Sequence, residues 1–473
     1  MTVDVHVVGG GLAGSEAAFQ LAERGHRVVL HEMRGVRGTE AHQTDRLAEL
    51  VCSNTFKSTE LTNAHGLLKA EMRLLGSLVL EGADAARVAA GSALAVDRDA
   101  FSRYVHERVL SHANITVTRE EVTAVPDAPA IIATGPLTSD ALAESVRARL
   151  GLQSLAFYDA IAPIVSLESI DETIAFRAAR WNKETMPTSG EGEGSRVWEE
   201  EADDSPSPFH TLLPSPSQVV EGAYLNCPLS REQYEVFLDA LLTADQFTAH
   251  EFDKVPYFEG CMPVEEMARR GRESLRFGPM KPVGLRDPRT GRRPWAVVQL
   301  RREDRGGRMW NLVGCQTRLR IPEQQRVFRM IPGLEQAEFL RYGSIHRNTY
   351  LNAPAALTPH LSLRDEPRIL FAGQLTGVEG YTESTATGLM GAINLSRLLA
   401  GKDAVLPPPV TMLGALYRYL READPQHFQP MNANFGLLDE LPDPPRDKQK
   451  KRELYAERSL AAMRAWIEEF RLT

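Results

Sequence analysis

VDVHVVGGGLAGSEAAFQLAERGHRVVLHEM, the stretch over residues 3–33, decides the fold of the first part of the chain. Its valine-rich start, up to Val8, is typical of a buried parallel strand. Residues 15–24 then have the composition of a helix, which Gly25 ends, and a second strand follows over residues 27–32. A strand, a glycine-rich turn, a helix and a second strand in this order predict an α/β domain with a parallel sheet.

The turn between the first strand and the helix has the pattern G-x-G-x-x-G, formed by Gly9, Gly11 and Gly14. Such glycines allow a tight turn, close approach of the backbone to a pyrophosphate, and close packing of the helix on the strand. The helix N-terminus supplies N–H groups for the anion, and an acid about twenty residues on accepts a hydrogen bond from a ribose hydroxyl. The pattern therefore predicts a dinucleotide site rather than a glycine-rich turn without a ligand. The residues expected on its ADP half are Gly9, Gly10, Gly11, Leu12, Ala13, Gly14, Glu32 and Met33.

Two later stretches indicate that the dinucleotide is FAD. AIIATG (130–135) and RILFAG (368–373) each have the pattern of a short buried strand closed by a turn of small residues. FAD is long enough to need contacts beyond its ADP half, and a late strand followed by a helix N-terminus would provide them. Together with the N-terminal unit, these two stretches resemble the FAD domain of glutathione-reductase-like flavoproteins. Gln374, however, stands where that pattern usually has an acid. The contacts predicted for this half are Gly373, Gln374, Gly380 and Tyr381.

At 473 residues, the chain is longer than one hydrophobic core usually serves. We predict an α/β fold in which a glutathione-reductase-like Rossmann FAD domain, residues 1–140 and 341–473, is interrupted by an inserted α+β domain over residues 141–340. The second part ends in an amphipathic helix. No apolar run is long enough to span a bilayer, and the N-terminus lacks the pattern of a secretory signal. We therefore expect a cytoplasmic protein with no membrane partner.

The net charge of −9 is unevenly distributed along the chain. Residues 265–330 contain seventeen Lys and Arg against seven Asp and Glu, which gives this segment a net charge of +10. A basic segment in an acidic chain is the electrostatic pattern of a polyanion-binding surface. The alternative is a set of surface arginines that pair with acidic residues, and composition alone leaves both interpretations open.

Several stretches together resemble one family: GGGLAGSEAA, VCSNTFKS, AYLNCPL, FEGCMPVEEMARRGRESLRFGPMKPVGL, NLVGCQTRL, RYGSIHRNTY and FAGQLTGVEGYTES. Nearly from end to end, the chain resembles the folate- and FAD-dependent tRNA (uracil-5-)-methyltransferases of bacteria. That family is related to larger flavoproteins that modify the wobble uridine of tRNA and carry an extra C-terminal helical domain, for which this chain has no room. The acidic, Gly- and Ser-rich loop at 184–210 is longer than the family requires.

The resemblance implies methylation of uridine 54 in the T-loop of tRNA. It also implies that 5,10-methylenetetrahydrofolate supplies the carbon and that FAD, recharged by NAD(P)H, supplies the reducing equivalents. Three other interpretations remain open. They are a flavoenzyme of wobble-uridine modification, a flavin oxidase of small amines, and a tRNA-binding module that holds FAD as a structural ligand.

Two cysteines suit this chemistry. Uracil C5 becomes nucleophilic only after a group adds to C6, which suits a thiolate, and an acid or base must later remove the C5 proton. The family uses two cysteines, and its motifs match Cys227, at the end of a predicted strand, and Cys52, in the loop after the second strand. We predict Cys227 as the C6 nucleophile and Cys52 as its partner or general acid/base. Cys261 and Cys315 are expected to be small buried residues, and no cysteine has the spacing of a metal ligand.

Polar residues in the other matched stretches are candidates for folate and tRNA binding. A pteridine must lie close to the flavin, and the residues that could orient it are Lys281, His346, Arg347 and Asn348. The basic segment is expected to contact tRNA phosphates through Arg292, Arg293, Arg301 and Arg302. No second G-x-G-x-x-G occurs, so NAD(P)H is expected to bind on the folate side of the flavin without a domain of its own.

Overall fold

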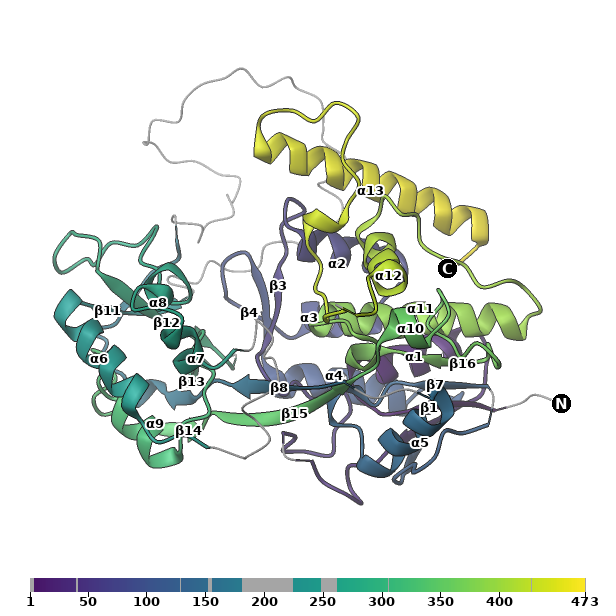
Figure 1. The fold of residues 1–473 in the computed structure, drawn as a ribbon, viewed down its shortest axis with the longest axis horizontal. Coiled ribbons are helices and arrows are strands. Elements are labelled where there is room, and N and C mark those ends of the chain that lie inside the picture. The colour runs from purple at the N-terminus through teal and green to yellow at the C-terminus, as the bar shows by residue number, and fades with distance from the viewer. Residues whose placement is uncertain are drawn as a thin grey trace.

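The computed structural model describes residues 4–39, 41–127, 129–151, 155–180, 224–247, 262–304, 306–426 and 428–472, with the backbone alone at 155–161 and 344–349. The loop at 184–210 and Cys261 therefore lie outside the described residues. The chain forms two lobes (Figure 1), a nucleotide lobe that carries both termini and an inserted lobe. Within the described ranges, no helix is long and apolar enough to cross a membrane.

A five-stranded parallel sheet forms the centre of the nucleotide lobe. Its strand order is β16 (Ile369–Phe371), β7 (Ala130–Ile132), β1 (Val5–Val8), β2 (Val28–Glu32) and β6 (Ile115–Arg119). β7 pairs with β1 on one side and with β16 on the other, so the late strand joins the N-terminal unit in one sheet. The predicted α/β fold is confirmed.

Helices cover both faces of this sheet. Because side chains alternate along a strand, Ile131 and Leu370 face one core while Ile132 and Phe371 face the other. The first core contains α1 (Leu12–Glu23), α3 (Leu78–Ala85) and α4 (Arg98–Leu110). The second contains α2 (Ala64–Leu74), α5 (Asp140–Leu150), α10 (Ala353–Ala356), α12 (Met412–Glu422) and α13 (Lys448–Phe470). α11 (Tyr381–Leu399) contributes to both, and a small antiparallel sheet has the order β3 (Thr55–Ser58), β5 (Ala93–Val96), β4 (Arg87–Val88).

The inserted lobe is built on a six-stranded sheet whose pairings are antiparallel. Its order is β10 (Phe176–Arg177), β11 (Tyr224–Leu229), β12 (Ala296–Arg302), β13 (Met309–Leu312), β9 (Ile164–Ser166) and β14 (Phe339–Arg341). Its helices are α6 (Arg231–Thr243), α7 (Val264–Arg269), α8 (Ser274–Phe277) and α9 (Ile321–Phe328). An antiparallel ribbon of β8 (Leu155–Ile161) and β15 (Ser344–Tyr350) runs between the lobes (Figure 1).

Helix α5 belongs to the nucleotide lobe. The sequence analysis begins the inserted domain at residue 141, within this helix. Leu142 and Val146 are buried in the same core as α2 and α12. In the structure, the chain therefore crosses into the inserted lobe later, in the segment between α5 and β8.

A buried carboxylate holds the C-terminal helices to the nucleotide lobe. Glu71 of α2 is fully buried and accepts hydrogen bonds from the N–H groups of Met412 and Leu413, each at 2.8 Å, in the first turn of α12. The hydroxyl of Ser459 on α13 donates to the same carboxylate. Burial raises the pKa of Glu71 to about 7. This one side chain therefore joins three helices.

We expect Glu71→Ala to lower the free energy of unfolding by about 2–4 kcal/mol, because it leaves two buried N–H groups and a buried hydroxyl without their acceptor. Urea unfolding measures this change. Glu457→Ala, at an exposed position of α13, is the matched control and should change the value by less than about 0.5 kcal/mol. Equal losses in the two variants would contradict the role given to Glu71.

Candidate functional site

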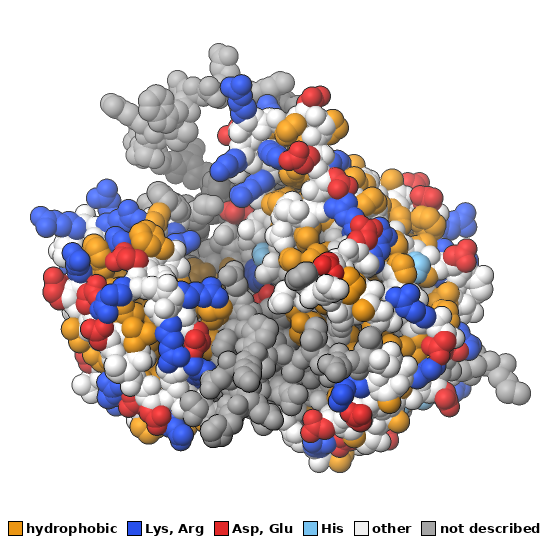
Figure 2. Space-filling view, viewed as in Figure 1, with side chains coloured by type: hydrophobic (Ala, Val, Ile, Leu, Met, Phe, Trp, Pro, Cys, Tyr) orange, Lys and Arg blue, Asp and Glu red, His pale blue; other side chains and the backbone are white. Residues whose placement is uncertain are grey.

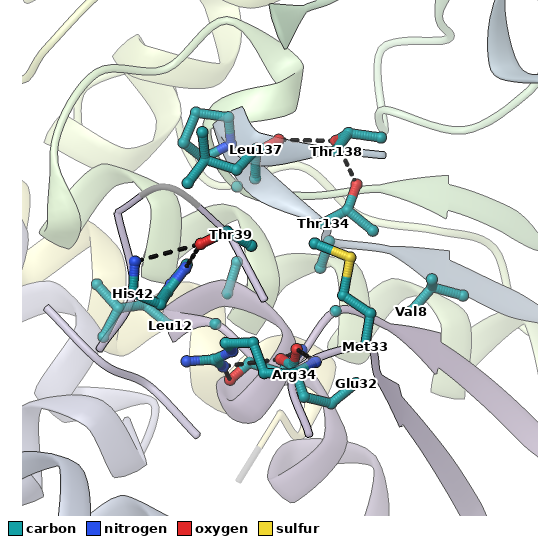
Figure 3. A pocket seen from close by; sticks show the side chains of 18 of the residues that line it. Val8, Leu12, Glu32, Met33, Arg34, Thr39, His42, Thr134, Leu137 and Thr138 are labelled. Atoms are coloured by element: carbon teal, nitrogen blue, oxygen red, sulfur yellow. Dashed lines mark hydrogen bonds and ion pairs between the residues drawn. The ribbon is translucent and has the colours of Figure 1, made fainter. Parts of the chain in front are cut away.

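A pocket opens at the carboxyl ends of the parallel strands (Figure 3), where ligands bind in open α/β sheets. The segments that follow β1, β2, β6, β7 and β16 all contribute to its wall. It encloses about 1190 Å³ of empty space, open solvent at its mouth included. The predicted residues that line it are Gly9, Gly10, Gly11, Leu12, Ala13, Glu32, Met33, Cys52, Gly373, Gln374 and Tyr381.

The glycines of the first turn have different tasks. Gly9 has a φ of +101°, and a Cβ on Gly14 would lie 1.7 Å from the carbonyl oxygen of Gly9, so Gly14 serves helix packing and does not line the pocket. A Cβ on Gly11 would meet no atom within 4 Å. Gly11 is the N-cap of α1, whose first N–H groups have no partner within the helix. An anion in the pocket can therefore bind at this turn.

Glu32 is held in place by Arg34, which the sequence analysis did not single out. One oxygen of Glu32 accepts from the N–H of Gly10 at 2.9 Å and from the Arg34 guanidinium at 2.7 Å, and the other accepts from the N–H of Arg34 at 2.8 Å. Burial alone would raise the pKa of Glu32, but the hydrogen bonds and charge of Arg34 outweigh it and lower the pKa. Figure 3 shows the pair at one end of the pocket. The carboxylate stays ionised and keeps free lone pairs for a ribose hydroxyl.

The turn after β16 forms the second wall. Gly373 has a φ of +76°, and its N–H donates to the hydroxyl of Thr387 at 2.7 Å. Gly380, predicted as a cofactor contact, does not line the pocket. It is the N-cap of α11, with a φ of +116°, and a Cβ there would lie 2.4 Å from an oxygen of Glu383. Gly380 thus shapes the start of α11, while its neighbour Tyr381 lines the pocket.

Cys52 lines the pocket beside Tyr381 and is partly exposed. The Tyr381 hydroxyl accepts hydrogen bonds from the N–H groups of Cys52, at 2.9 Å, and Ser53, at 3.1 Å. Burial raises the pKa of Tyr381, so the phenol stays protonated near neutral pH. The backbone that carries the thiol is therefore fixed against the pocket wall.

Cys227 lies elsewhere. The sequence predicted Cys227 at the end of a strand. In the structure, β11 continues through Cys227 and Pro228, so Cys227 lies inside the strand. β10 pairs with β11 only at Leu225 and Asn226, and along the described residues the strand has no partner on that side afterwards, which is where a strand tolerates proline. The Cys227 side chain is fully buried in the core of the inserted lobe, and burial raises the pKa of its thiol. Cys315 is buried in the same core, as expected.

Many arginines of the basic segment form ion pairs, and Figure 2 shows acidic and basic side chains interspersed on the visible face of the inserted lobe. Arginines of the segment with an acidic partner include Arg269, Arg272, Arg276, Arg289, Arg308, Arg318, Arg320 and Arg326. Arg301, predicted as a tRNA contact, is instead 7% exposed and packed at the domain junction. Arg302 is partly buried beside the ring of Trp310.

The remaining candidates divide into two groups. Arg292, Arg293 and Lys281 are exposed on the inserted lobe and do not line the pocket. His346, Arg347 and Asn348 belong to β15 in the ribbon between the lobes, and their side chains lie outside the described residues. Among the described residues, no group of three or more His, Cys, Asp or Glu could hold a metal ion.

Comparison with known proteins gives the family. A family model described as glucose inhibited division protein A matches residues 4–200 and 209–403. The methylenetetrahydrofolate–tRNA-(uracil-5-)-methyltransferase of Geobacter sulfurreducens is 54% identical to the chain over 468 residues, which is 99% of each. The chain belongs to this methyltransferase family. The methyltransferase of the same name from Desulforudis audaxviator is 52% identical over 471 residues, again 99% of each chain.

Solved structures support the same fold. A crystal structure of Aquifex aeolicus GidA matches with a TM-score of 0.65 at 15% identity and covers 99% of this chain and 75% of that chain. A second crystal form of GidA gives a TM-score of 0.63 at 16% identity. At such identity the likeness concerns the fold alone. The family and this fold agree with the architecture predicted from the sequence.

We expect purified Gly11→Val protein to lose its yellow colour, because the valine side chain would enter the pocket where the pyrophosphate must approach the backbone. Its thermal unfolding without flavin should match that of the wild-type apoprotein, since a Cβ on Gly11 touches nothing. Absorbance near 450 nm measures flavin occupancy. Gly38→Val, at an exposed glycine that is also free of contacts and does not itself line the pocket, is the control and should stay yellow. Full flavin occupancy in Gly11→Val would contradict the site.

Proposed function

We propose that this protein methylates C5 of a uridine in tRNA, at position 54 of the T-loop. In this proposal the carbon comes from 5,10-methylenetetrahydrofolate and the reducing equivalents come from FAD recharged by NAD(P)H. One observation carries it. A partly exposed thiol, Cys52, lines a dinucleotide pocket in a chain that matches, at 54% identity over 99% of each sequence, a methyltransferase named for this reaction.

The residues of the pocket fit FAD. Glu32, ionised and held by Arg34, suits the ribose of the ADP half, and the turn at Gly11 suits the pyrophosphate. Gly373 and Gln374, with the start of α11, suit the rest of the molecule. When bound, the reduced flavin supplies the electrons that convert a methylene group into a methyl group. What the chain itself must do is bind the cofactor, hold the uracil ring and move a proton.

The described geometry favours Cys52 as the thiol that adds to uracil C6. It lines the pocket, whereas Cys227 is fully buried and its thiol resists ionisation because burial raises its pKa. The addition forms an S–C6 bond at the expense of the C5=C6 π bond and makes C5 a nucleophile, which bonds the carbon donated by the folate. A base then removes the C5 proton as the S–C6 bond breaks and the thiolate leaves. We therefore propose Cys52, in place of Cys227, as the nucleophile. A role for Cys227 would require β11 to expose its inner face.

The exposed basic residues offer a surface for tRNA phosphates. Arg292 and Arg293 are exposed, in contrast to Arg301. Backbone phosphates bind through such charges, and the binding weakens as salt increases. Lys281 is also exposed on the inserted lobe, and we propose that it binds the folate together with His346, Arg347 and Asn348.

The function is tested by the tRNA nucleosides of a strain that lacks the gene. We expect mass spectrometry to find ribothymidine lost, and restored by the wild-type gene but not by Cys52→Ala. Loss of a wobble-uridine modification in its place would support the related flavoenzyme activity. An unchanged nucleoside profile would reject tRNA methylation.

A tRNA with 5-fluorouridine at the target should trap a covalent complex, because fluorine cannot leave C5 as the proton does. We expect the adduct with wild-type protein and with Cys227→Ala, and none with Cys52→Ala, as seen by a shifted band on a denaturing gel. Cys315→Ala, from the same core as Cys227, is the control for packing effects. An adduct lost in Cys227→Ala but kept in Cys315→Ala and Cys52→Ala would return the nucleophile role to Cys227.

A further inference from the structure

The segment that carries Cys52 lies where the two lobes meet. Tyr381, from the nucleotide lobe, accepts from the N–H of Cys52. The carbonyl oxygen of Cys52 accepts a hydrogen bond from Nη2 of Arg98 at 3.2 Å. Two residues further on, Nδ2 of Asn54 donates to the carbonyl oxygen of Arg302 in the inserted lobe at 2.8 Å. Groups from both lobes therefore fix the backbone around the thiol.

Arg98, the first residue of α4, is the centre of these contacts. Besides the Cys52 carbonyl, its Nη1 donates to the carbonyl of Leu50 at 2.5 Å, and its Nε donates to Glu303 of the inserted lobe at 2.6 Å. The Glu303 side chain is 1% exposed. Burial alone would lower the pKa of Arg98, but the charge of Glu303 raises it. The guanidinium fork holds three acceptors in one geometry, which a lysine ammonium cannot reproduce.

A second contact runs beside this ion pair. The fully buried Asn54 accepts a hydrogen bond from Nε of Arg301 at 2.8 Å. Nη2 of Arg301 lies 3.8 Å from Oε1 of Glu303, and no donor in the described part of the chain hydrogen-bonds that oxygen. The hydrogen-bonded counter-charge of Glu303 is therefore Arg98.

The thiol of Cys52 is surrounded by charge. Among the described residues, Arg98 and Arg341 are cations within electrostatic range of it, Glu303 is an anion of the same cluster, and the Tyr381 phenol lies close by. A cation near a thiol favours the thiolate and an anion disfavours it. Glu303, from the other lobe, is thus the counter-charge of a cation whose guanidinium hydrogen-bonds the Cys52 carbonyl.

We propose that Arg98 and Glu303 are positioning residues for Cys52: an ion pair across the domain junction that fixes the backbone of the thiol and sets the charge around it. The inference rests on the proposed function, in which Cys52 meets the uracil ring. It adds that the inserted lobe takes part in the reaction through this pair as well as through a tRNA surface.

Two substitutions should shift the protonation of Cys52 in opposite directions. Glu303→Gln keeps the shape of the side chain but leaves the charge of Arg98 uncompensated, which favours the thiolate. Arg98→Met removes the cation and leaves the carboxylate, which disfavours the thiolate. We expect the midpoint of the pH dependence of Cys52 alkylation to fall by about one pH unit in Glu303→Gln and to rise by about as much in Arg98→Met.

The experiment treats the flavin-loaded, full-length protein with iodoacetamide over a pH series and quantifies the alkylated Cys52 peptide by mass spectrometry, so that other cysteines do not contribute. The double variant should return the midpoint toward that of the wild type. Asp84→Asn breaks a more exposed ion pair, Arg73–Asp84 at 2.8 Å, elsewhere in the nucleotide lobe and should shift nothing. Midpoints that stay at the wild-type value, or that move in the same direction in both single variants, would overturn the proposal.

A kinetic measurement tests the positioning. Arg98→Lys keeps the charge but loses the fork, so we expect kcat of tRNA methylation to fall roughly 10- to 100-fold with the KM for tRNA unchanged. Its alkylation midpoint should stay near that of the wild type. The alkylation needs no tRNA or folate. A wild-type protein that does not methylate tRNA would therefore reject the proposed function, while the effect of the ion pair on Cys52 could still be measured. If the wild-type protein methylates tRNA but the alkylation midpoints of the variants do not shift, the proposed role of the ion pair is rejected and the proposed function stands.

Discussion

The backbone contact between α1 and α11 is the constraint on which the nucleotide lobe depends. A Cβ on Gly388 of α11 would lie 2.2 Å from the carbonyl oxygen of Ala13 in α1, and a Cβ on Gly373 would lie 3.1 Å from the Ala13 side chain. These two helices come from opposite parts of the sequence, and only glycine allows them to approach so closely. Their contact makes the turn after β1 and the turn after β16 adjacent walls of one pocket. A cofactor that spans both turns is the expected consequence of this packing.

The same arrangement explains how the second lobe is attached. β7 and β16 are neighbours in the sheet, and the inserted lobe lies between them in the sequence. The chain therefore leaves the sheet and returns to it at adjacent strands, so its outgoing and returning segments run side by side in opposite directions. The antiparallel pairing of β8 with β15 has this geometry. A pocket at the carboxyl ends of the strands then lies beside the base of the ribbon, where the Cys52 segment meets both lobes.

Local patterns in the sequence predicted the nucleotide lobe well, because its signals lie within short stretches. The turn at Gly9–Gly14 and the acid Glu32 needed only the order of strand, turn and helix. The burial of Cys227 could not be predicted in this way, since it depends on the pairing of β11 with β12, about seventy residues later in the chain. Gly380 was assigned to the cofactor for its motif, but its positive φ and the nearby Glu383 give it a structural task.

The ion pairs of the basic segment depend in part on residues distant in the sequence. Composition left two interpretations of the +10 charge, and the ion pairs account for only part of the segment. Arg272 pairs with Glu235 and Arg320 with Asp245, so part of the charge is used within the inserted lobe. The exposed Arg292 and Arg293 remain for a polyanion. A count of charges could not show which arginines are paired and which are exposed.

The position of β12 sets a geometric requirement for the substrate. This strand begins shortly after the exposed Arg293 and ends next to Glu303, which bonds Arg98 beside Cys52. At about 3.3 Å per residue, its seven residues separate the two ends by roughly 20 Å. A tRNA whose phosphates bind near Arg293 must therefore reach along the lobe to bring a base to the pocket. A uridine flipped out of its loop can enter the pocket without its neighbours, while phosphates farther along the tRNA contact the exposed arginines.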